Sequence, residues 1–142
     1  MDDPYNLERF LEAQNPIYEK VRSELRDGHK TSHWMWFVFP QIAGLGHSRL
    51  SEKFAISSLE EARAYLRHPV LGARLVACTE LVLNTAGRTA EQIFGYPDDL
   101  KFRSSMTLFA RAATDDPVFE NAVRKYFGGE YDPLTLERLT LS

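Results

Sequence analysis

Residues 31–41 combine a histidine with the most aromatic stretch of the chain. His33 precedes six consecutive large apolar residues at 34–39, which include both tryptophans, and Gln41 follows them. Imidazole exchanges protons near neutral pH, so His33 is the candidate acid–base residue, and Trp36 and Gln41 are candidate ligand contacts. The alternative is structural: His33 would stand at a helix start and donate a hydrogen bond to a nearby carbonyl.

Two histidines four residues apart raise the question of a metal site. His29 and His33 would share one face of a helix. Zinc proteases with this spacing carry a glutamate directly after the first histidine, whereas this chain has Lys30 there. Its positive charge would repel a metal ion. We therefore predict no metal site, and the sequence identifies no cofactor.

Glycine, serine and arginine gather at residues 44–49, Gly-Leu-Gly-His-Ser-Arg. Two glycines let backbone N–H groups approach an anion, and Ser48 and Arg49 add side-chain donors. The segment lacks the third glycine of a dinucleotide fingerprint and the Gly-Lys-Ser/Thr of a P-loop. Two interpretations stay open: a plain connecting turn, and a turn in which Ser48 and Arg49 contact a phosphate-like group.

Residues 101–108, Lys-Phe-Arg-Ser-Ser-Met-Thr-Leu, place three hydroxyls inside a predicted helix. Serine and threonine are mediocre helix formers because their hydroxyls compete for backbone hydrogen bonds. Close helix packing would explain them, since small residues permit it. A polar cavity would explain them equally, with Lys101, Arg103 and Ser105 as candidate ligand contacts. A Ser/Lys nucleophilic pair would also need a deprotonated lysine, which nothing in the sequence indicates.

Helical signals recur in the segments that must position these residues. Apolar residues return at helical spacing from residue 7 to residue 139, between capping residues, and no segment is typical of a β-hairpin. Ser57 with Glu60 or Ser58 with Glu61 is the predicted start of one helix, and Thr89 with Gln92 is the predicted start of a short helix at residues 90–94. Residues 34–39 fit a helix or a buried strand, although Ser32 as N-cap and Pro40 as terminator favour a short helix. Residues 40–50 are predicted to form a loop. The sequence thus predicts an all-α fold: a single compact domain, residues 1–142, with about six to eight helices around a central aromatic segment.

Size and charge narrow the classes of function. A chain of 142 residues fits one domain. The formal net charge of −3 argues against binding to a nucleic acid polymer or an anionic membrane, which needs a basic face. The longest apolar run is six residues, far below a membrane span, and the acidic start is not typical of a signal peptide. With a single cysteine, Cys78, these features predict a cytoplasmic protein.

Several long motifs together resemble a known family. They are residues 33–41 with the Gly-Leu-Gly turn at 44–46, residues 58–66 with His-Pro at 68–69 and Leu-Gly at 71–72, residues 98–109, and Asp132 with Thr-Leu at 135–136. In this order, over almost the whole chain, they resemble the bacterial domain-of-unknown-function 1810 family. The resemblance implies a mainly α-helical single domain and implies no activity. Some members carry the label calpastatin, but calpain inhibitors of that kind are long and disordered, unlike this short, aromatic-rich chain.

The residue chemistry favours a small-ligand pocket formed by residues 33–41, the 44–49 loop and the polar face of helix 101–107. Basic and hydroxyl donors beside aromatic rings suit a small anionic, nucleotide-like molecule, and hydrolysis or group transfer with His33 as acid–base is the enzymatic form of this hypothesis. The rival hypothesis is a protein-interaction module or homo-oligomer without catalysis. A concave pocket with His33 and Lys101 would favour the first, and a flat apolar patch the second.

Overall fold

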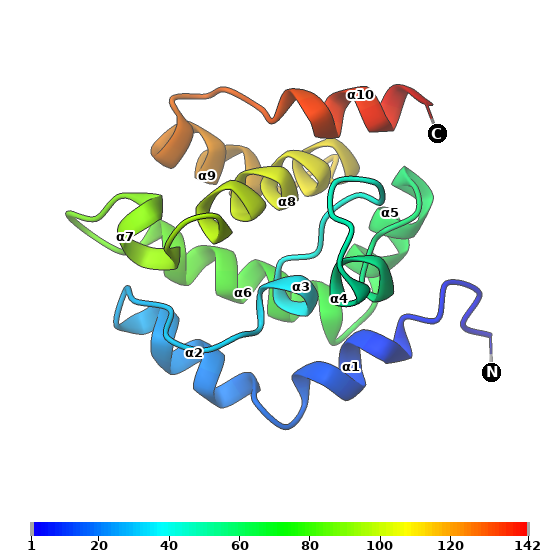
Figure 1. Cartoon of the computed structure of the whole chain (residues 1–142), viewed down its shortest axis with the longest axis horizontal. Helices are drawn as coiled ribbons and strands as arrows, with labels where there is room; N and C mark the ends of the chain where they lie inside the picture. The colour runs from blue at the N-terminus through cyan, green and yellow to red at the C-terminus, as the bar shows by residue number, and fades with distance from the viewer. Residues whose placement is uncertain (1, 142) are drawn as a thin grey trace.

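Helices form all the regular elements between residues 2 and 141, the part of the chain that the structure, a computed structural model, describes (Figure 1). In chain order they are α1 (Glu8–Gln14), α2 (Tyr18–Arg26), α3 (Met35–Val38), α4 (Arg49–Lys53), α5 (Leu59–Arg67), α6 (Leu71–Leu83), α7 (Ala90–Phe94), α8 (Asp98–Ala112), α9 (Val118–Phe127) and α10 (Pro133–Leu141). The prediction of an all-α fold is confirmed. The predicted six to eight helices are too few, because the described residues form ten.

The loop predicted at residues 40–50 is shorter than expected, because α4 begins inside it. Ser48 starts this helix: its Oγ accepts a hydrogen bond from the backbone N–H of Ser51 at 3.1 Å. An isolated β-bridge between Ile42 and Ile56 then ties the loop to the segment after α4. The loop is therefore held at both ends.

The aromatic stretch 34–39 contains a helix, α3, so the strand alternative is wrong. Trp34 is the N-cap residue of α3, in place of the predicted Ser32. The hydroxyl of Ser32 instead donates a 2.6 Å hydrogen bond to Glu24 in α2. Trp34 and Phe39, at the two ends of the stretch, are buried in the hydrophobic core.

The centre of the fold is α8, and the aromatic stretch lies beside it. Residues of α8 contact α3, α5, α7, α9 and α10, and Figure 1 shows α8 between α10 on one side and α1 and α2 on the other. The Phe102 ring of α8 stacks on Phe94 with centroids 4.6 Å apart and meets Phe39 edge-on at 5.1 Å. Such aromatic pairs add to the stabilisation from burial, so α7 and the segment after α3 are held against α8.

Two of the predicted helix starts are confirmed. Ser58 Oγ accepts a hydrogen bond from the backbone N–H of Glu61 at 3.1 Å, which caps α5. Thr89 and Gln92 form a complete capping box at the start of α7. In both cases the cap satisfies backbone N–H groups that have no partner within the helix.

Candidate functional site

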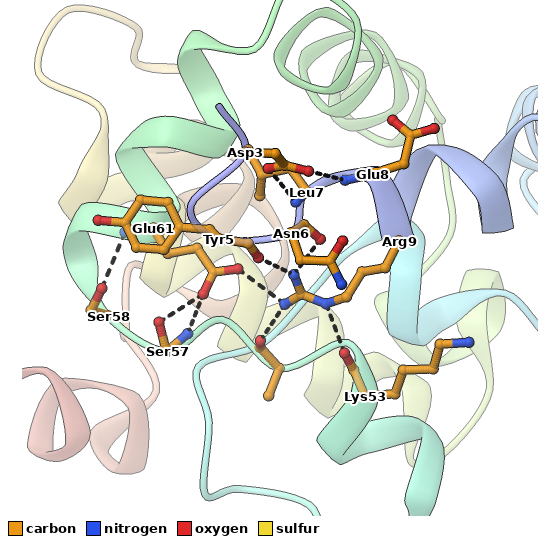
Figure 2. A network of polar contacts seen from close by, with 11 residues as sticks. Asp3, Tyr5, Asn6, Leu7, Glu8, Arg9, Lys53, Ser57, Ser58 and Glu61 are labelled. Atoms are coloured by element: carbon orange, nitrogen blue, oxygen red, sulfur yellow. Dashed lines mark hydrogen bonds and ion pairs between the residues drawn. The ribbon is translucent and has the colours of Figure 1, made fainter. Parts of the chain in front are cut away.

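A dense polar network surrounds Arg9, and its role is structural (Figure 2). The guanidinium donates five hydrogen bonds of 2.6–3.0 Å, to the carbonyls of Tyr5, Asn6, Lys53 and Ala55 and to the carboxylate of Glu61. A guanidinium has five N–H donors, so none remains for a ligand. The network fastens the N-terminal segment to the connection between α4 and α5.

A second closed network surrounds the buried carboxylate of Glu24. It accepts hydrogen bonds from the N–H groups of Thr31 and Ser32 at 2.8 and 3.1 Å, from the Ser32 hydroxyl at 2.6 Å and from Trp34 Nε1 at 2.9 Å. Burial raises the pKa of this carboxylate, but the hydrogen bonds outweigh burial and lower the pKa to about 2. Glu24 is therefore ionised at neutral pH and anchors the segment that leads into α3.

A cavity of about 380 Å³ lies between the loop after α3 and the N-terminal half of α8; we call it the loop cavity. Its polar lining comprises Gln41, Ser51, Lys101, Arg103, Ser104 and Asp132. Its other lining residues are Leu45, Gly46, Pro97, Leu100, Pro133 and Leu134. The volume falls in the range of small-molecule sites, roughly 300–1,000 Å³.

Lys101 brings incompletely neutralised positive charge to the loop cavity. Its ammonium lies 3.5 Å from one oxygen of Asp98 and 5.3 Å from the centre of the Trp36 ring. The ammonium of Lys30 holds the other oxygen of Asp98 at 2.7 Å. Two ammonium groups and one carboxylate leave a net charge of +1, and Lys101 is the more exposed cation, at 26% against 6%.

The segment before α10 supplies the opposite wall of the loop cavity. Arg103 donates hydrogen bonds to the carbonyls of Glu130 and Tyr131 at 2.9 and 3.1 Å. The Ser104 hydroxyl lies 3.1 Å from a carboxylate oxygen of Asp132. Some of the Arg103 N–H groups therefore hold the segment before α10 in place. Asp132 adds a negative charge close to any ligand in the cavity.

Four of the site residues predicted from the sequence come together here. Gln41, Lys101 and Arg103 line the loop cavity. Trp36, which is half-buried, lies against the ammonium of Lys101. The end of the aromatic stretch, the following loop and α8 thus meet at one place.

The other four predicted site residues do not line the loop cavity. His33 and Arg49 are exposed elsewhere, and Ser48 caps α4. Ser105 is fully buried, and its hydroxyl has no hydrogen-bond partner among the described residues. The site is therefore narrower than the sequence predicts, and its concave surface carries Lys101 without His33.

The two glycines of the 44–49 loop are explained by packing. Gly44 has a positive φ of 96°, and a Cβ there would lie 2.7 Å from the guanidinium carbon of Arg138. A Cβ on Gly46 would lie 2.6 Å from the Ser51 hydroxyl. The positive φ of Gly44 and the close approach of Ser51 to Gly46 therefore account for the two glycines, which favours the connecting-turn interpretation.

Sequence reasoning missed several lining residues, among them Ser104, Asp132, Leu100 and Leu134. Ser104 belongs to the hydroxyl-rich segment that the sequence singles out. Asp132 gives only a helix-start signal, and the two leucines give only an apolar pattern. These residues come together because α10 packs on α8, and no sequence pattern within a few residues indicates that packing.

Within residues 2–141, no group of three or more His, Cys, Asp or Glu side chains is placed to hold a metal ion. None of the helices in the described part of the chain combines the length and apolar character needed to cross a membrane.

Comparison with known proteins identifies relatives of the chain. Residues 4–139 match the family described as "Protein of unknown function (DUF1810)". The structure is similar to the crystal structure, at 1.38 Å, of a conserved hypothetical protein from Mycobacterium tuberculosis: the TM-score is 0.97, the identity is 54%, and the match covers 99% of this chain and 100% of that one. Among curated proteins, none matches. Neither description names a ligand or an activity.

Proposed function

The chain belongs to the DUF1810 family, and we propose that it binds a small organic anion in the loop cavity. The observation that carries the proposal is the position of Lys101, whose ammonium shares Asp98 with Lys30 and lines a cavity of about 380 Å³. A cation that is only partly neutralised attracts an anion most strongly where surrounding walls reduce the access of water. Since His33 lies outside this cavity, the proposal is binding without catalysis.

The walls of the loop cavity indicate what kind of anion it suits. Leu45, Leu100 and Leu134 offer apolar surface for a ring or a short hydrocarbon body, and Gln41 offers an amide for a directed hydrogen bond. The carboxylate of Asp132 disfavours a high negative charge. An anion of one or two negative charges with an apolar body, such as an aromatic carboxylate or a mononucleotide, therefore fits better than a nucleoside triphosphate.

Thermal-shift melting of the full chain tests the proposal. The probes are adenosine monophosphate, adenosine triphosphate and benzoate, each over a concentration series. A ligand at 100 times its dissociation constant stabilises the fold by about 2.7 kcal/mol, which shifts the melting temperature by several degrees in a domain of this size. We expect a larger shift from the monophosphate or benzoate than from the triphosphate.

Two lysine variants make the test specific to the cavity. Lys101→Ala removes a charge-assisted hydrogen bond worth roughly 1.5–3 kcal/mol, so affinity should fall by about tenfold or more. Lys20→Ala is the control, because Lys20 is exposed in α2, away from the lining residues. Absence of a shift with all three probes, or a shift that is equal in both variants, would contradict the proposal.

A second candidate function, protein interaction, is supported by apolar side chains around the same cavity. Tyr96, Leu100 and Leu134 are 73%, 47% and 59% exposed. Apolar surface of this kind, rimmed by polar groups, is typical of an association surface. Light scattering over a concentration series tests whether the chain forms a homo-oligomer. On this hypothesis the melting temperature rises with protein concentration, and Leu134→Ser abolishes that rise.

A further inference from the structure

A second cavity of about 380 Å³ lies at the other end of α8; we call it the arginine cavity. It is bounded by α5, α6, the connection from α8 to α9, and α9. At about 1.5 Å of rise per residue, the 11 positions from Lys101 to Ala112 correspond to about 16 Å along α8. The two cavities are therefore separate places on the molecule.

The arginine cavity is lined by charges of both signs that form no ion pair with the described residues. Arg63 and Arg67 lie one turn apart on α5, and Asp115 and Asp116 lie on the connection between α8 and α9. The ion pairs found among residues 2–141 all lie elsewhere. One oxygen of Asp116 accepts a hydrogen bond from the backbone N–H of Val118 at 3.0 Å. The other oxygen and both guanidinium groups therefore remain available.

Apart from Thr114, the remaining residues that line the cavity are apolar. Leu66, Val76 and Phe119 contribute to its lining. The site therefore combines three kinds of surface: a positive wall, a negative wall and an apolar wall.

We infer that the arginine cavity binds an amphipathic zwitterion of about the size of a dipeptide. Its carboxylate would lie between Arg63 and Arg67, because guanidinium groups match the geometry of a carboxylate and bind it with two hydrogen bonds. Its ammonium would lie at Asp115 and Asp116, and its side chain would pack on the apolar wall.

The two aspartates distinguish this ligand from a simple anion. A phosphate at the arginines would leave both carboxylates without a counter-charge and would be repelled by them. A zwitterion supplies one charge of each sign, so it satisfies both walls at the same time. The lining thus favours a zwitterion over a simple anion. The separate positions of the arginines and the aspartates set the orientation of the bound zwitterion.

Calorimetric titration of the full chain with leucyl-glycine tests this inference. The comparison probes are N-acetyl-leucyl-glycine, which lacks the ammonium, leucyl-glycinamide, which lacks the carboxylate, and inorganic phosphate. A hydrogen bond to a charged group is worth roughly 1.5–3 kcal/mol, so each blocked peptide should bind about tenfold or more weakly. Phosphate should show no binding.

Two variants assign each charge of the peptide to its wall. With Arg63→Gln, leucyl-glycine should bind about tenfold more weakly, and amidation should cause a smaller further loss than in the wild type, because only Arg67 remains to bind the carboxylate. With Asp115→Asn, acetylation should likewise cause a smaller loss than in the wild type, because only Asp116 remains to bind the ammonium. Arg26→Gln, an exposed arginine of α2, is the control and should bind as the wild type does. Melting temperatures of the free variants verify that each is folded.

Three results would overturn the inference. Binding of phosphate in place of the peptide would identify a simple anion site. Absence of peptide binding at millimolar concentration would mean that the charges of the two walls neutralise each other or remain hydrated. Binding that survives both Arg63→Gln and Asp115→Asn would place the peptide elsewhere.

Discussion

Replacing Glu24 by glutamine should destabilise the fold by an amount that depends on pH. The carboxylate accepts four hydrogen bonds from the segment that leads into α3. These bonds outweigh the effect of burial and lower its pKa from 4.5 to about 2. Each pKa unit corresponds to roughly 1.4 kcal/mol. Ionised Glu24 therefore contributes about 3 kcal/mol to the free energy of unfolding at neutral pH.

The sign of the pH dependence follows from the direction of the shift. Because the pKa in the folded state lies below the ordinary value of 4.5, the contribution is fully present above that pH and is lost as the pH falls toward 2. Glutamine resembles the protonated acid at every pH. The stability difference between wild type and Glu24→Gln should therefore shrink from about 3 kcal/mol at pH 7 toward zero at low pH.

Urea unfolding followed by circular dichroism at several pH values measures this difference directly. Glu19→Gln is the matched control: this exposed carboxylate of the same helix pairs with Arg22 at 3.2 Å, and such pairs contribute about 0.5 kcal/mol or less. A difference for Glu24→Gln that stays constant between pH 7 and pH 3 would refute the reasoning. The loss would then come from the shape of the amide and not from the charge.

Three further substitutions test other contacts. Gly72→Ala should lower the melting temperature, because the new Cβ would lie 2.1 Å from the carbonyl oxygen of Leu66. Alanine favours helices over glycine by about 1 kcal/mol, so a higher melting temperature would contradict this close approach. Arg9→Met leaves the buried Glu61 without its ion-pair partner at 3.0 Å. The free energy of unfolding, measured with urea, should therefore fall by about 3–5 kcal/mol. A fall below about 1 kcal/mol would contradict a structural role for Arg9. Thr89→Ala removes the cap of α7 and should cost about 1 kcal/mol, with faster hydrogen exchange in that helix; unchanged exchange would count against the cap.

Local signals predicted the helices well, because caps and apolar periodicity act within a few residues. Ser58 and Thr89 start helices as predicted, since each bonds to a residue three positions later. Ser32 failed as a predicted cap for a non-local reason. Its hydroxyl and its N–H both donate to the carboxylate of Glu24, eight positions earlier, so charge-assisted bonds to another helix fix Ser32 in place of a local cap.

The candidate site was predicted only in part, because its residues meet through tertiary packing. Ser104 and Ser105 are neighbours of the same type, yet Ser104 lines the loop cavity beside Asp132 while Ser105 is fully buried. Successive helix positions point about 100° apart, so one seryl side chain faces the wall before α10 and the next faces the core. The sequence identifies the hydroxyl-rich helix, but the packing of α10 decides which serine borders the cavity.

A charged side chain is free to bind a ligand only where the fold leaves its hydrogen-bonding groups unused. Arg9 and Arg63 are the same residue type, but all five N–H groups of Arg9 donate hydrogen bonds within the chain. Arg63 instead lines a cavity and forms no ion pair within residues 2–141. Glu24 and Asp115 differ in the same way. The conspicuous polar residues near the aromatic stretch therefore fasten the fold, and the binding that we propose rests on less conspicuous charges on α5, α8 and the connection to α9.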